Sequence, residues 1–187
     1  MARVPYVDPE AASPAAQAAL ERLPPLNVFR LVALADSAFV PWLRFGGALL
    51  GDLELDPKLR ELAILLVAAR SEAEYEWVQH VGIGKAVGLV DEQIAALERG
   101  DLGAADFDPA QQAALAFVAA MLDRPRPDDE LFAALGEHLP PRQIVELLLV
   151  AGAYQMLAHV MTALDIDLDP AADPSFIEST RRADQGD

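Results

Sequence analysis

Apolar residues recur at intervals of three and four along most of the chain, which is the spacing of one face of a helix. Segments that alternate apolar and polar residues, as a half-buried strand does, are almost absent, and no Asn-Gly or Asp-Gly pair marks a hairpin. The pattern therefore predicts an all-α protein. The predicted helices cover residues 13–23, 37–51, 56–70, 71–88, 90–100, 108–124, 128–139 and 140–164.

Start and stop signals divide these segments. A cap residue satisfies a free backbone N–H at the start of a helix, and a proline directly after it fits the first helical position. Such pairs begin at Ser13, Asp56 and Asp108. Gly88 is suited to the left-handed conformation that ends a helix. Pro41 falls near the first turn of its segment, where its missing N–H costs little.

Two segments are unusually apolar. The segment 56–70 is apolar almost all round, so we expect it at the centre of a helical bundle. The segment 144–164 is long enough to span a bilayer, but Glu146, Gln155 and His159 interrupt it. It is better interpreted as a buried helix, with His159 inside, or as two short helices broken near Gly152.

Length and charge narrow the class of protein. The 187 residues, 53% of them apolar, suit a single domain over 1–187, with a core of about residues 20–168 and a surface tail over 169–187. A formal charge of −16 argues against nucleic acid or an anionic membrane as a partner. The start of the chain has no apolar stretch of the length a secretory signal needs, so we expect a cytoplasmic protein.

The chemistry of the sequence concentrates in SEAEYEWVQH, residues 71–80. Glu76 and His80 are four residues apart and share one helix face, and a carboxylate beside an imidazole is a common acid–base pair. Tyr75 and Trp77 flank the pair as walls, with the phenol as a second donor, and the small Ala73 leaves room for a ligand.

Glu61 is a third candidate, on the preceding helix. If Glu61 belongs to the inward stripe that continues through Leu65, its buried carboxylate needs a partner, and His80 is an obvious one. Alternatively, Glu61 pairs with Lys58 at the surface. His80 taken alone is more often a satisfied core or surface histidine than a catalyst. Two further acids, Glu72 and Glu74, are interpreted as a solvated helix start, where the helix dipole favours negative charge.

The sequence contains no motif that would hold a metal ion or an organic cofactor. The chain has no cysteine, which excludes disulfides, thiolate ligands and cysteine nucleophiles. A metal site from Glu61, Glu76 and His80 would have a single imidazole, and no Gly-rich nucleotide motif is present. We therefore expect no cofactor and no metal.

Residues 59–97, LRELAILLVAARSEAEYEWVQHVGIGKAVGLVDEQIAAL, resemble the core motif of the carboxymuconolactone decarboxylase family, whose superfamily includes the alkylhydroperoxidase D proteins. The resemblance extends over most of residues 20–168. It implies an alkylhydroperoxidase D-like helical bundle, assembled as a homotrimer or homohexamer. A weak echo of "REL…LLVAA…QHV" in "VELLLVAGA…AHV" suggests an internal duplication.

Peroxidase members of that superfamily carry Cys-x-x-Cys-x-x-x-His with an upstream glutamate. By resemblance, the two cysteine positions are Ala73 and Glu76 here, while His80 and Glu61 keep the proton-relay positions. Peroxide reduction by that route needs a thiolate nucleophile, so thiol peroxidase activity is not expected, even though likeness alone would group the chain with alkylhydroperoxidase and peroxiredoxin-like proteins.

The decarboxylase branch does not need the cysteines, and it implies a cofactor-free carboxy-lyase acting on a small carboxylated or lactone substrate. In such a decarboxylation, loss of CO₂ leaves a dienolate, which His80 would reprotonate. Glu76 and Glu61 would orient the His80 ring, and the Tyr75 hydroxyl would donate a hydrogen bond to the developing oxyanion. Trp77 and Ala73 would contact the substrate. A substrate carboxylate would be held by Arg60 or Arg70, if either is not merely a surface charge. The alternative is a non-catalytic protein that binds a small molecule or serves assembly on the same fold, so catalysis itself stays open.

Overall fold

The computed structural model describes residues 1–171, and within them the chain forms helices and no strand. A 3₁₀ turn covers Pro9–Ala11. The α-helices are α1 (Pro14–Leu20), α2 (Asn27–Val32), α3 (Asp36–Gly51), α4 (Pro57–Arg70), α5 (Glu74–Ala86), α6 (Asp91–Glu98), α7 (Pro109–Asp123), α8 (Asp129–Gly136) and α9 (Pro141–Ala163). The prediction of an all-α protein is confirmed.

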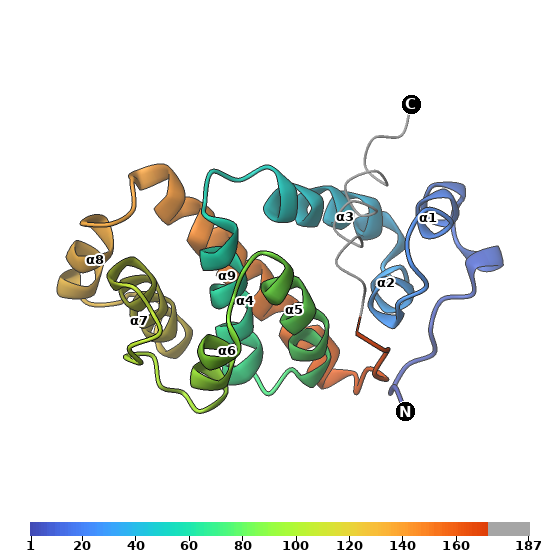
Figure 1. Cartoon of the computed structure of the whole chain (residues 1–187). Helices are drawn as coiled ribbons and strands as arrows, with labels where there is room; N and C mark the ends of the chain where they lie inside the picture. The colour runs from blue at the N-terminus through green and yellow to red at the C-terminus, as the bar shows by residue number, and fades with distance from the viewer. Residues whose placement is uncertain (172–187) are drawn as a thin grey trace.

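Helix α4 lies at the centre of the bundle, as its sequence predicts. Every residue from Leu59 to Ala68 is buried, and the helix packs against α5, α7 and α9 (Figure 1). The Asp56 side chain accepts hydrogen bonds from the backbone N–H groups of Lys58 and Leu59, so the predicted cap fixes where the helix begins.

A second apolar cluster joins the N-terminal helices to the end of α9. Residues of α1, α2 and α3 pack there with Met161 of α9, and the cluster includes Val7 and Ala16, which precede the predicted start of the core. Residues 164–171, which follow α9, run beside α2 and the N-terminus (Figure 1), where Asp167 accepts a hydrogen bond from the Tyr6 hydroxyl. Of the predicted surface tail, residue 169 is tied to this region, as shown below, and residues 172–187 lie outside the described part of the chain.

One short helix was missed by the sequence analysis, and one local prediction is wrong. Helix α2 was not predicted, because it has six residues, follows Pro24 and Pro25, and has no side-chain cap at Leu26. Pro41 lies well inside α3, since that helix begins at Asp36. It therefore removes one interior backbone hydrogen bond instead of sitting harmlessly in the first turn.

Helix α9 is one continuous helix, and Gly152 does not break it. By length and composition alone α9 could cross a membrane, yet it also packs along α4 as a core helix does. His159 is exposed, contrary to the prediction that it is buried. The outer face carries Val145, Leu149, Met156 and Val160, so a row of apolar side chains faces outward. Assembly as a homotrimer or homohexamer stays a prediction, which analytical ultracentrifugation would test.

Candidate active site

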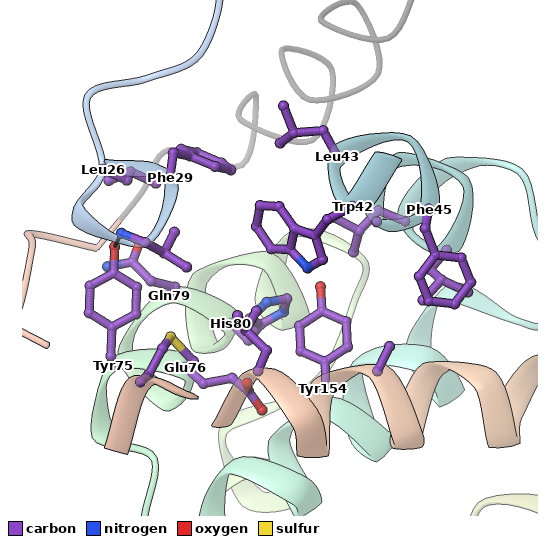
Figure 2. A pocket seen from close by; sticks show the side chains of 17 residues that line it. Leu26, Phe29, Trp42, Leu43, Phe45, Tyr75, Glu76, Gln79, His80 and Tyr154 are labelled. Carbon is purple, nitrogen blue, oxygen red and sulfur yellow. Dashed lines mark hydrogen bonds between the residues drawn. The ribbon is translucent and has the colours of Figure 1, made fainter. Parts of the chain in front are cut away.

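A cavity of about 80 Å³ lies between α2, α3, α5 and α9 (Figure 2). A single buried water needs roughly 10–15 Å³, so there is room for several waters or a small organic molecule. Most of the lining is hydrocarbon or aromatic. The polar or titratable groups among the lining residues are Trp42, Tyr75, Glu76, Gln79, His80 and Tyr154.

The Glu61 and His80 side chains are in direct contact. Glu61 Oε2 lies 2.8 Å from His80 Nδ1, and the Glu61 side chain has no exposed surface. Because a carboxylate can only accept, this contact places the ring proton on Nδ1. It leaves Nε2, on the other side of the ring, as the nitrogen that can exchange a proton with a ligand.

Arg60 is the second partner of the buried Glu61 carboxylate. Its Nε donates to Glu61 Oε1 over 2.9 Å, and its Nη1 donates to the Leu50 carbonyl over 2.6 Å. Arg60 is 5% exposed, so the guanidinium is a structural counter-charge inside the bundle. It holds the Glu61 carboxylate from the side opposite His80 and thereby fixes the imidazole.

Tyr154 of α9 supplies a hydroxyl that the sequence analysis did not identify. Its ring meets His80 edge-on, with centroids 4.9 Å apart at 87°, and its hydroxyl points into the cavity (Figure 2). Burial, together with the charges of Glu61 and Glu76, holds the pKa of Tyr154 well above its usual range. The phenol therefore stays protonated and is available as a hydrogen-bond donor. The available signal was a tyrosine among small residues in an otherwise apolar helix.

Glu76 lines the cavity as a buried, unpaired carboxyl group. It is 2% exposed, and neither oxygen has a hydrogen-bond partner in the part of the chain that the structure describes. Burial raises the pKa of Glu76 well above the ordinary value of 4.5, which favours the neutral acid. The interpretation that Glu76 orients His80 is not supported by this geometry, because Glu61 is the carboxylate that contacts the ring.

Tyr75 also lines the cavity, but its hydroxyl is engaged elsewhere. It donates to Asp169 Oδ2 over 2.6 Å and accepts from the Val28 N–H over 3.3 Å. The same Asp169 oxygen accepts from the Asn27 N–H at the start of α2, 2.6 Å away. Tyr75 thus helps to hold α2 over the cavity, and Tyr154 is the phenol placed to meet a ligand.

Gln79 was a second omission of the sequence analysis. It is buried on the cavity wall, and its Nε2 donates to the carbonyl oxygens of Asp169 and Pro170. An amide three residues after Glu76, and so on the same face of α5, was the signal that could have identified it.

Comparison with known proteins agrees with this architecture. Residues 38–120 match the model of the carboxymuconolactone decarboxylase family. This segment, somewhat less than half of the chain, is therefore similar to that family. A search among curated proteins finds no significant match.

Solved structures extend the likeness to the whole fold. An uncharacterized peroxidase-related protein from Ralstonia eutropha JMP134, described as an alkylhydroperoxidase AhpD core, is 19% identical with a TM-score of 0.78, covering 96% of each chain. A peroxidase-related protein from Silicibacter sp. TM1040 is 20% identical, with a TM-score of 0.69 over 76% of each chain. Debrominase Bmp8, in complex with 2,3,4-tribromopyrrole, is 14% identical, with a TM-score of 0.70 over 98% of this chain and 96% of its own. The chain therefore has the alkylhydroperoxidase D-like fold.

The structure separates the two positions that resemblance to the cysteine-bearing members of this superfamily assigns to cysteines. Glu76 lies in the cavity, whereas Ala73 caps the start of α5 and does not line the cavity. Trp77 is turned about 100° around the helix from Glu76, and lies with Ala73 along a separate surface hollow that also includes Glu72 and Glu74. Substrate contact by Trp77 and Ala73 in the cavity therefore has no support in this geometry.

The remaining candidates from the sequence analysis lie at the surface. Glu72 and Glu74 are exposed, as predicted. Arg70 forms a surface ion pair with Asp123. Within residues 1–171, no group of three His, Asp or Glu side chains is arranged to hold a metal ion.

The sequence echo in the second half of the chain does not reproduce the pair formed by Glu61 and His80. Its glutamate and histidine, Glu146 and His159, lie 13 residues apart on one straight helix, about 20 Å along its axis. Glu146 instead accepts from the Leu55 N–H and from Arg142.

The raised pKa of Glu76 predicts a pH-dependent stability. Above about pH 4.5 the unfolded chain releases this proton, whereas the folded protein keeps it, so rising pH favours unfolding until it reaches the folded-state pKa. Relative to wild type, Glu76→Gln should therefore gain up to about 1.4 kcal/mol of unfolding free energy per pH unit across this window. Urea denaturation at several pH values measures this gain. Glu74→Gln, an exposed neighbour, is the matched control, and a difference between Glu76→Gln and wild type that does not change with pH would contradict the assignment.

Proposed function

We propose that this protein, whose segment 38–120 is similar to the carboxymuconolactone decarboxylase family, is a cofactor-free acid–base enzyme acting on a small lactone or related carbonyl compound. The observation that supports it most is the buried contact between Glu61 and His80 at the wall of a small cavity. A histidine held by a carboxylate on one ring nitrogen, with the other available to a ligand, is a common arrangement for a general base.

The proposed reaction begins with proton transfer at a carbon next to a carbonyl. His80 Nε2 takes the proton, the electron pair of the C–H bond moves toward the carbonyl oxygen, and an enolate forms. The Tyr154 hydroxyl donates a hydrogen bond to that oxygen. The imidazolium then returns the proton to another carbon of the conjugated system, which completes an isomerisation.

Decarboxylation would use the same groups. Nε2 of His80 is first protonated from solvent; the carbon–carbon bond to the carboxylate then breaks, CO₂ leaves, and the bonding electrons remain in a dienolate that takes the Nε2 proton. In both reactions the negative charge of Glu61 stabilises the imidazolium while it exists. Glu76 is a neutral proton donor beside this path, and its side chain would have to rotate to reach a substrate, because its oxygens are almost completely buried.

The experiment is a substrate panel of unsaturated lactones and β-keto acids incubated with the pure protein in D₂O containing EDTA. Deuterium exchange followed by NMR reports proton transfer, and CO₂ release reports decarboxylation. We expect at least one lactone to exchange deuterium faster with protein than without it. Absence of both exchange and CO₂ release across the panel would overturn the proposal.

A binding protein without catalysis is the second candidate, and the almost wholly apolar lining favours it. The similar fold of debrominase Bmp8, in complex with 2,3,4-tribromopyrrole, supports a cavity for a small ring in either case. This candidate predicts a ligand that raises the melting temperature and is recovered unchanged. A chemically altered ligand would refute it.

A further inference from the structure

We infer that α2 is a lid over the cavity and that the Asp169 carboxylate is the latch that holds this lid closed. The inference goes beyond the proposed function, because access to the cavity matters equally to an enzyme and to a binding protein.

Helix α2 forms one side of the cavity. Val28 and Phe29 line the cavity from this helix, and Leu26 lines it from the position directly before (Figure 2). Both Val28 and Phe29 are buried, so the helix covers the space beside them. In Figure 2, Leu26 and Phe29 lie on the far side of Trp42 from Phe45, an exposed residue on the α3 rim. An opening at α2 would therefore be separate from a passage past Phe45.

The sequence of α2 does little to hold this helix in place. It has six residues, follows Pro24 and Pro25, and receives no side-chain cap from Leu26. A helix this short is unstable unless other parts of the protein hold it. Among the helices of residues 1–171, α2 is the one without a closely packed partner helix. Helix α2 therefore depends on its buried side chains and on the hydrogen bonds made to its first turn.

Two side chains from elsewhere in the chain bind the N–H groups at the start of α2. The Asn27 N–H donates to Asp169 Oδ2 over 2.6 Å. The Val28 N–H donates to the Tyr75 hydroxyl over 3.3 Å, and this hydroxyl donates to the same Asp169 oxygen over 2.6 Å. The first N–H groups of a helix have no partner inside it, so Asp169 acts from a distance as a cap residue does locally. Its bonds are strong because a carboxylate is the acceptor.

The segment that carries Asp169 is itself bound to two helices that line the cavity. On α5, Gln79 Nε2 donates to the backbone carbonyls of Asp169 and Pro170, over 3.4 and 3.2 Å. On α2, the Asn27 side chain donates to the Asp167 carbonyl over 3.1 Å. Helix α5 packs closely on α4, whereas α2 has no such support. Release of the Asp169 carboxylate would therefore free the first turn of α2 while the α5 side of the cavity stays in place.

The first readout is hydrogen exchange of the full chain, followed by mass spectrometry. Asp169→Ala removes the latch, and the backbone amides of residues 27–33 should exchange at least about tenfold faster, as expected for the loss of a hydrogen bond to a charged group. The amides of residues 59–68 in α4 should exchange as in wild type, which shows that the bundle is intact. Tyr75→Phe removes the hydroxyl between Asp169 and Val28 and should act in the same direction. Asp169→Asn keeps the shape without the charge, so it should give a smaller effect and serves if the alanine variant does not fold.

The second readout reports whether the cavity itself opens. Trp42 lines the cavity, whereas Trp77, the other tryptophan of the chain, does not. In a Trp77→Phe background, acrylamide quenching of Trp42 fluorescence therefore measures access to the cavity. Asp169→Ala should raise the Stern–Volmer constant by about twofold or more, because the closed state would no longer dominate.

Asp167→Ala is the matched control. The Asp167 carboxylate binds Ala2 and Tyr6 near the N-terminus, and its contact with α2 is through the backbone carbonyl. Both readouts should therefore stay at their wild-type values in this variant.

Three outcomes would overturn the inference: unchanged exchange of α2 in Asp169→Ala, unchanged quenching of Trp42 in that variant, or equal effects of Asp167→Ala. Faster exchange without greater quenching would mean that α2 loosens without opening the cavity, which leaves Phe45 as the entrance. Neither readout uses a substrate, so the result does not depend on whether any compound in the panel is turned over.

Discussion

Replacing His80 with alanine is expected to lower the turnover of a substrate found in the panel by roughly 10²–10⁴-fold, the usual contribution of a general acid–base group. Among the described residues that line the cavity, His80 is the one whose ring is held by a buried carboxylate through Nδ1, which leaves Nε2 to exchange a proton with a ligand. Steady-state kinetics measures the loss, which should fall mainly on kcat, because the aromatic walls that bind the ring remain.

The chain offers a matched control for this variant. His159 is exposed on α9, so His159→Ala removes the same side chain from the same protein without touching the cavity. It should leave kcat and KM unchanged. Equal activity of His80→Ala and His159→Ala, with both variants folded by circular dichroism, would remove His80 from the reaction.

The sequence was informative where a local rule decides the outcome. Asp56 and Asp108 cap the helices they were predicted to start, because the capping contact lies within three residues of the cap. The inward position of Glu61 followed from the apolar stripe that it continues, whereas the sequence left open whether Glu61 contacts His80 directly, through water or not at all. The inward position depends on helix periodicity, which a sequence contains directly.

The sequence was uninformative where a distant contact decides. Tyr75 looked like a free donor, but its hydroxyl is engaged by Asp169, which is 94 residues away along the chain. Arg60 looked like a surface charge or a substrate clamp, until packing against the end of α3 brought the Leu50 carbonyl to it. Trp77 does not line the cavity for a local reason: it directly follows Glu76, about 100° further around α5.

Replacing Arg60 with leucine is expected to lower the free energy of unfolding by about 3–5 kcal/mol, because it leaves a buried carboxylate without its cation. Glu61 would keep only His80 as a partner, and the Leu50 carbonyl would lose its donor. Urea denaturation at pH 7 measures the change. Arg70→Leu is the matched control, since its exposed pair with Asp123 should contribute no more than about 1 kcal/mol.

The double variant Arg60→Leu with Glu61→Gln distinguishes loss of charge balance from loss of packing. Removing the carboxylate charge together with the guanidinium leaves no uncompensated ion, so the double variant should be more stable than Arg60→Leu alone. It should nevertheless be slow in catalysis, because glutamine cannot stabilise the His80 imidazolium as a carboxylate does. A double variant no more stable than Arg60→Leu would instead show that Arg60 acts mainly through its hydrogen bond to Leu50 and its packing. The Glu61 charge would then need no counter-ion beyond His80, and Arg60 would have no part in holding the proposed base.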